Sequence, residues 1–249
     1  MFPIGDQNEP GRGPAYVTLL LIAINLAVFF LIQSPEADNP AQPFTYGYSA
    51  IPAEITHGID LVRPEVITVD GQRMVVPEAP GPDPIYLTLI TSLFMHAGLI
   101  HLFGNMLFLW IFGDNVEHRL GHLRYLLFYL AAGVVATLAQ VAATPDSVIP
   151  TLGASGAISG VLGAYLVLFP HNRVTIVVLR FIPYRVPAIV AIGMWAVFQL
   201  LSSVASPAGE VAGGVAYLAH IGGFVFGVVV GLLVRSTGIG GNRPRYAWR

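Results

Sequence analysis

The residues of this 249-residue chain best suited to do chemistry are a serine and a histidine. Ser155 lies in the run Gly153-Ala154-Ser155-Gly156, whose small neighbours would let a substrate backbone approach a nucleophilic hydroxyl. A helix that begins at this serine offers unpaired backbone N–H groups and the positive end of its dipole to a developing oxyanion. His220 is a residue type that takes the proton of such a hydroxyl as a general base. The pair predicts nucleophilic catalysis.

Each of these residues also has a simpler interpretation. Serine is a favoured N-cap residue and often only packs inside membrane helices, whereas a lone histidine there can be a proton relay or a packing residue. His101 and Asn105 favour the catalytic interpretation, because residues four apart share one face of a helix. The catalytic interpretation requires the helices to bring Ser155, His220 and His101 to one depth, with Asn105 about one turn deeper.

The helices that must position these residues are expected to span a membrane. The chain is 55% hydrophobic and 10% charged, with a mean hydropathy of +0.69, whereas soluble domains carry about 25% charged residues. The absence of cysteine and lysine excludes thiolate, disulfide and Schiff-base chemistry. A hydrocarbon core of about 30 Å needs about 20 helical residues. We therefore expect an all-α membrane protein with six transmembrane helices, at residues 15–32, 87–112, 123–143, 155–169, 186–204 and 215–234.

The fourth apolar run is short, so its helix is expected to begin inside the bilayer. Its 15 residues extend about 22 Å, and residues 150–154 before it must be non-helical, which is tolerated only where protein or a water-filled cavity meets them. Counted along their helices, Ser155 and His220 lie about 21 Å and His101 about 18 Å from one membrane face. No acidic residue lies at that depth, which predicts a dyad without a third carboxylate member.

Small residues at four-residue spacing predict that the fourth and sixth helices touch. Gly156 and Gly160 lie in the fourth run, and Gly223, Gly227 and Gly231 lie in the sixth. Glycines at this spacing permit close backbone contact in membranes. A hydrogen bond between Ser155 and His220 is therefore geometrically possible.

Charge distribution predicts the orientation of the chain. Ten of the 12 arginines lie on the side that holds both chain ends, and ten of the 14 acids lie on the other side. By the positive-inside rule, residues 1–14 and 235–249 are cytoplasmic tails of a membrane domain at 15–234. The first apolar run is expected to be a retained span, because it is long and a multi-span domain follows. The lack of a targeting peptide and the six-span form favour the plasma membrane of a prokaryote.

Residues 34–84 are expected to form a long, proline-rich external connection between the first two spans. Within it, residues 66–69 and 72–76 flank Asp70-Gly71, a dipeptide that suits a two-residue hairpin turn. The alternative is a tight turn in a disordered loop. The chain has no internal repeat and no basic patch for nucleic acid.

Three motifs carry a resemblance to a known family. They are His-Ala-Gly-Leu-Ile-His-Leu-Phe-Gly-Asn at 96–105, Gly-Ala-Ser-Gly at 153–156 and Ala-His-Ile-Gly-Gly-Phe at 219–224. In this order and on these spans, the sequence resembles the rhomboid intramembrane serine proteases. The resemblance implies a six-helix rhomboid-like bundle in the lipid bilayer, with Ser155 as nucleophile and His220 as base. It also implies oxyanion donors from His101, Asn105 and the Ser155 N–H, and hydrolysis of peptide bonds in or near transmembrane segments of substrate proteins without metal or cofactor.

The sequence departs from the family pattern near the dyad. Several bacterial members carry a tyrosine four residues after the nucleophile that stacks on the imidazole, and this position is Ser159 here. The ring must then be held by the Ser159 hydroxyl or by close glycine packing.

Trp195 and Gln199 are one turn apart on the fifth span. We expect Gln199 to form a hydrogen bond between helices and the aromatic ring of Trp195 to pack beside it. His96 is expected to line the mouth of the pocket or to cap the helix.

Two other functions compete with proteolysis. A catalytically inactive rhomboid-like protein would bind transmembrane clients, but such members typically lack the serine or the histidine. A transporter would explain midplane histidines and a broken helix, yet it predicts interrupted helices in both halves of the chain, and only one run is short. The substrate, the cleavage site and the oligomeric state are left open by the sequence.

Overall fold

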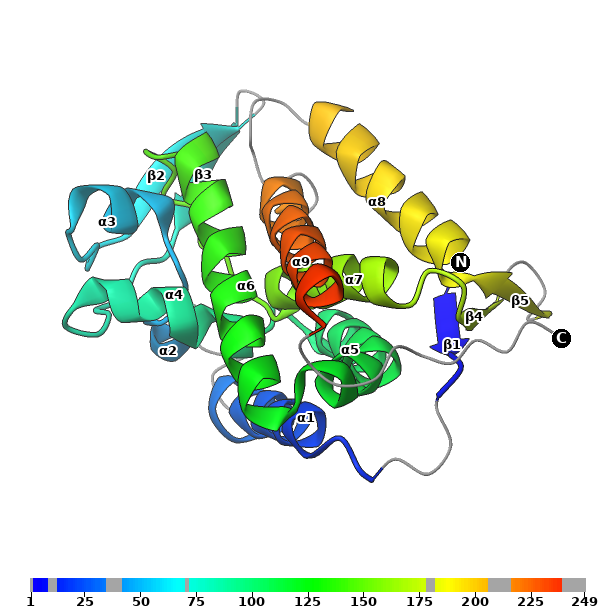
Figure 1. Ribbon diagram of the computed structural model, residues 1–249. Helices are drawn as coiled ribbons and strands as arrows, with labels where there is room; N and C mark the ends of the chain where they lie inside the picture. The colour runs from blue at the N-terminus through cyan, green and yellow to red at the C-terminus, as the bar shows by residue number, and fades with distance from the viewer. Residues whose placement is uncertain are drawn as a thin grey trace, which may run out of the picture.

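Helices form most of the chain in the computed structural model, which describes residues 2–8, 13–34, 42–69, 72–177, 182–205 and 216–238 (Figure 1). The long helical segments are α1 (Tyr16–Val28, continued by a π-helix at Phe29–Gln33), α5 (Leu99–Leu120), α6 (His122–Ala143), α7 (Ser155–Leu168), α8 (Ala188–Ala205) and α9 (Tyr217–Thr237). Among the described residues, α1 with its extension, α5, α6 and α9 are long and apolar enough to cross a membrane. The apolar helices α7 and α8 are shorter, so the count of six spans stays a prediction.

Helix α7 lies in the middle of the bundle, surrounded by α5, α6 and α9 (Figure 1). Every residue from 156 to 165 is buried, because this stretch is apolar or small on all sides. The helix that packs most extensively on α7 is α9. A methyl group on Gly223 would overlap the carbonyl oxygen of Gly156, and one on Gly227 would overlap that of Gly160. The predicted glycine contact between these helices is confirmed.

The second apolar run does not form the single helix predicted at 87–112. Short helical turns occupy Ile85–Leu87, α4 (Thr88–Thr91) and Ser92–Phe94, and α5 begins only at Leu99. The chain breaks at His96, where the Gln33 side chain accepts a hydrogen bond from the backbone N–H (2.9 Å) and donates one to the carbonyl oxygen (3.3 Å). Because this side chain takes both backbone groups, they are not available to a continuous helix.

The connection between α1 and α5 is an ordered structure in its described parts. It contains α2 (Pro43–Gly47), α3 (Pro52–His57) and an antiparallel hairpin of β2 (Glu65–Val69) and β3 (Gln72–Val76). Val69 pairs with Gln72, which confirms the predicted hairpin, although Asp70-Gly71 itself lies outside the described residues. Ala50 and Thr151 exchange backbone hydrogen bonds of 3.0 and 2.8 Å, which anchors this connection to the segment before α7.

A three-stranded sheet that the sequence did not predict lies at the other end of the bundle. Strand β1 (Phe2–Gly5) pairs with β4 (Arg173–Val177), which pairs with β5 (Pro183–Pro187). Asp6 follows β1 and accepts hydrogen bonds from the Tyr165 hydroxyl (2.5 Å) and the Asn115 amide (2.8 Å). The N-terminal residues therefore dock onto α5 and α7.

Candidate active site

Ser155 is the first residue of α7, as predicted, and no side chain caps this helix end. The first helical hydrogen bond runs from the Ile158 N–H to the Ala154 carbonyl (2.9 Å), so the N–H groups of residues 155–157 have no partner inside the helix. The chain reaches this point through Gly153, whose φ of 120° favours glycine. The Gly153 N–H donates to the Ser92 carbonyl at 2.8 Å, which holds the turn against the connection.

His220 lies in the first turn of α9 and faces Ser155. Its Nε2 is 2.8 Å from the Ser155 hydroxyl oxygen. The close packing of α7 and α9 through Gly223 and Gly156 makes this separation possible, because larger side chains would hold the helices apart. The other ring nitrogen, Nδ1, is 2.7 Å from the side-chain oxygen of Gln199 on α8. If Nε2 accepts the serine proton, Nδ1 carries a hydrogen and donates it to Gln199.

His101 and Asn105 of α5 approach the same turn from the opposite side. The Ala97 N–H donates to His101 Nδ1 at 3.4 Å, which leaves Nε2 as the protonated nitrogen. A Cβ on Gly153 would lie 2.9 Å from that Nε2 and 3.7 Å from the Asn105 amide nitrogen. The Asn105 amide nitrogen is buried and has no hydrogen-bond partner among the described residues. Both side chains thus bring N–H donors to the backbone just before Ser155.

A cavity of about 1180 Å³ joins these residues, and we call it the serine cavity. Its walls come from the connection, α5, α6, the turn before α7, and α9. The structure brings all four residues singled out in the sequence into its lining, namely His101, Asn105, Ser155 and His220. This arrangement presents a hydroxyl, an imidazole and several N–H donors to one cavity.

One of the two alternatives for holding the imidazole, the Ser159 hydroxyl, is wrong, and so is the expectation for His96. The Ser159 hydroxyl donates to the Ser155 carbonyl oxygen at 2.7 Å, so it does not hold the imidazole. Serine in a helix commonly bonds the carbonyl four residues back, and this local bond prevailed. His96 neither lines the serine cavity nor caps α5. It is buried behind His101, with the ring centroids 5.1 Å apart in an edge-to-face arrangement.

The expected interhelical hydrogen bond of Gln199 is confirmed, and its partner is His220. The sequence placed Gln199 and Trp195 together on the fifth helix but held no signal for their depth relative to the imidazole. The Trp195 ring lies beside the same histidine, with centroids 6.2 Å apart and planes tilted by 36°. These two residues also border a second, apolar cavity.

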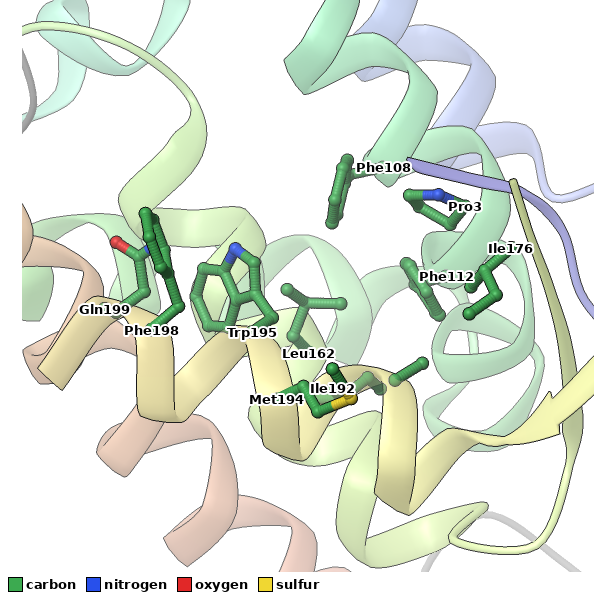
Figure 2. Close-up of a pocket in the computed structure, with 11 residues that line it drawn as sticks. Pro3, Phe108, Phe112, Leu162, Ile176, Ile192, Met194, Trp195, Phe198 and Gln199 are labelled. Atoms are coloured by element: carbon green, nitrogen blue, oxygen red, sulfur yellow. The ribbon is translucent and has the colours of Figure 1, made fainter. Parts of the chain in front are cut away.

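The apolar cavity has a volume of about 480 Å³ and lies between α5 and α8. Figure 2 shows Phe108 and Phe112 of α5 on one side and Trp195, Phe198 and Gln199 of α8 on the other. Pro3 and Ile176 of the three-stranded sheet close one end. Gln199 therefore lines the apolar cavity and also contacts His220 of the dyad.

The comparison with protein families decides the affiliation of this chain. A family model described as Rhomboid domain matches residues 84–237, which include α5 to α9 and all four site residues. The chain belongs to the rhomboid family. This membership and the long apolar helices establish an integral membrane protein.

Several curated rhomboid proteins are similar to this chain over part of their length. Rhomboid protein 1, mitochondrial, of Saccharomyces cerevisiae is 36% identical over 158 residues, covering 61% of this chain and 42% of the yeast protein. Rhomboid protease GluP of Bacillus subtilis is 45% identical over 85 residues, or 34% of this chain and 16% of GluP. The presenilin-associated rhomboid-like protein, mitochondrial, of Bos taurus is 30% identical over 152 residues, covering 56% of this chain and 36% of the bovine protein. Each match spans less than half of the relative.

Proposed function

We propose that this rhomboid-family protein is an intramembrane serine endopeptidase that hydrolyses peptide bonds in or near transmembrane segments of membrane proteins. The observation that carries the proposal is the 2.8 Å separation of the Ser155 hydroxyl and His220 Nε2 inside the serine cavity. A hydroxyl becomes nucleophilic when an adjacent base takes its proton. The similarity to a protein named a rhomboid protease supports the same activity.

The proposed reaction has two steps. Ser155 Oγ attacks the carbonyl carbon of the scissile bond while His220 takes its proton, and His220 then protonates the leaving amine. The acyl-enzyme that remains is hydrolysed by a water activated by the same imidazole. Both steps pass through a tetrahedral intermediate with negative charge on the former carbonyl oxygen.

Stabilisation of that oxygen is assigned to the Ser155 N–H, His101 Nε2–H and the Asn105 amide. The Asn105 amide supports this assignment, because a buried donor without a partner costs about 1–3 kcal/mol. A substrate oxygen in the cavity would supply the missing acceptor. No metal or cofactor takes part in the proposed reaction.

The proposed setting is a six-span bundle with both termini in the cytoplasm of a prokaryote. The shortness of α7 supports a position of Ser155 below the external membrane surface, where the serine cavity would admit water. A substrate helix must unwind to reach the serine, because helical carbonyls are hydrogen-bonded to their own chain. Segments with small or helix-destabilising residues are the expected substrates.

A fluorophosphonate probe tests the proposal on detergent-purified protein. We expect the wild-type chain to be labelled and the Ser155→Ala and His220→Ala variants to lose labelling, with parallel loss of cleavage of a reconstituted transmembrane substrate. Ser236→Ala, which removes an exposed hydroxyl bonded to its own helix, is the matched control and should label normally. A Ser155→Ala protein that still labels, or a folded wild-type protein that neither labels nor cleaves, would contradict the proposal. The latter result would favour a protein that only binds transmembrane clients.

A further inference from the structure

The second ring nitrogen of His220 has a partner that the proposed mechanism does not use. Gln199 is 94% buried and lies on α8, and its side-chain oxygen is 2.7 Å from His220 Nδ1. We propose that Gln199 is the positioning residue of the catalytic base, holding His220 in the tautomer and orientation that it needs to accept the Ser155 proton. This inference rests on the proposed protease function and adds a third member to the dyad.

The tautomer argument gives Gln199 a definite role. A base that accepts the serine proton at Nε2 must carry its own hydrogen on Nδ1. The Gln199 side-chain oxygen can only accept, so it favours the form with Nδ1–H and disfavours the unproductive one. The two hydrogen bonds, 2.8 and 2.7 Å long, lie on opposite sides of the ring and fix its plane.

Two other neighbours of the ring, Ser159 and Trp195, do not supply this restraint. The Ser159 hydroxyl is bonded to the Ser155 carbonyl, and the Trp195 ring is tilted by 36° to the imidazole at 6.2 Å. Within the described part of the chain, the titratable group close enough to act on the charge of His220 is His101 of α5. That neighbour is another imidazole and not a carboxylate. The group that bonds Nδ1 of the base is the neutral side-chain amide of Gln199 on α8.

A neutral acceptor suits this environment. A carboxylate at the same place would have to be desolvated and would stabilise the imidazolium strongly. An amide oxygen orients the ring without adding a buried charge. Because Gln199 belongs to α8, whereas Ser155 and His220 belong to α7 and α9, the orientation of the base also depends on where α8 lies.

The test follows the rate of probe labelling at Ser155 against pH and probe concentration, using the full chain. Gln199→Met keeps the size of the side chain but removes the acceptor, and we expect the maximal labelling rate to fall about tenfold or more. Apparent probe affinity should change little. Gln199→Glu should retain labelling, with the acid limb of its pH profile moved to higher pH, because a carboxylate favours the protonated ring. Leu201→Met, an exposed change on the same helix, is the control and should match the wild type.

The outcomes separate this inference from the proposed function. If wild type labels, Ser155→Ala does not, and Gln199→Met keeps both the wild-type rate and pH profile, the positioning role is wrong and the protease proposal stands. Should Gln199→Met fail to fold, the Gln199→Glu profile decides, since an unmoved acid limb overturns the role. A wild-type protein without labelling or cleavage refutes the protease proposal itself.

Discussion

At the scale of single residues, the candidate site contains a hydrogen-bond donor whose partner is not among the described residues. The Asn105 amide nitrogen is buried, has no partner in the described part of the chain, and lies near Gly153 just before the serine. Most buried donors in folded proteins have a partner, so this open donor calls for an explanation. In the proposed reaction, the oxygen of the tetrahedral intermediate would be the acceptor for this amide.

Replacing Asn105 by alanine should therefore slow catalysis without abolishing it. One oxyanion donor contributes about 3 kcal/mol in well-studied enzymes, so we expect a fall of about 10²-fold in kcat with little change in KM. Cleavage kinetics on a reconstituted substrate measure this. Asn115→Ala, on the same helix but bonded to Asp6, is the control and should leave kcat unchanged. A kcat of Asn105→Ala equal to the wild-type value would remove Asn105 from the oxyanion site.

At the scale of elements, the decisive contact is that of α7 with α9. Gly223 and Gly227 face the carbonyl oxygens of Gly156 and Gly160, and this lets the backbones approach until Ser155 and His220 are within hydrogen-bond distance. Helix α8 contributes the side chain of Gln199 to the same place. The separation of these two helices therefore sets the distance between the Ser155 hydroxyl and the His220 imidazole.

Gly227→Ala should destabilise the protein, because the new methyl group would overlap the Gly160 backbone, which cannot move aside as a flexible side chain can. Overpacking of this kind costs about 1–3 kcal/mol. Gly193→Ala on α8 is the matched control, since a Cβ there meets no atom of the described residues within 4 Å. It should be neutral or stabilising by up to about 1 kcal/mol. The midpoints of thermal unfolding, monitored by circular dichroism, compare the two variants. Equal midpoints for Gly227→Ala and Gly193→Ala would contradict the packing argument.

At the scale of the whole molecule, carboxyl groups are buried both in the connection between α1 and α5 and beside the three-stranded sheet. Burial raises the pKa of Glu78 to about 8, and the charges of Glu54 and Glu65 beside it act in the same direction. Burial likewise raises the pKa of Glu54 to about 7, and that of Asp6 beside the three-stranded sheet to about 7. All three groups are proton-bound when the protein folds at mildly acidic pH.

Stability should accordingly fall as pH rises. A free glutamate has a pKa of 4.5, so between about pH 5 and 8 the folded chain binds more protons than the unfolded chain and the free energy of unfolding decreases. Glu78→Gln keeps a neutral side chain at every pH and should reduce this decrease. Unfolding midpoints at pH 5, 6.5 and 8 measure the effect, which we expect to be several degrees in the wild type. Stability that increases over this range would contradict the assignment.

Local features of the sequence predicted much of this protein. Apolar runs and their breaks located the long helices, the start of α7 at Ser155 and the hairpin of β2 and β3, because hydrophobic length and turn residues act over a few neighbours. They failed at 87–112, where a distant side chain, Gln33, bonds the backbone of His96 and interrupts the helix. The pairing of β1 with β4 was missed for the same reason, since it joins segments far apart in the chain.

The sequence alone determined the membrane character, the motifs and the residue types of the candidate site, since all of these are properties of composition and short-range spacing. Only the tertiary structure decided that Gln199 meets His220, that Ser159 bonds its own helix and that His96 is buried behind His101. The physical reason is that the rotation and depth of each helix relative to its neighbours are set by packing between distant segments, which no local pattern encodes.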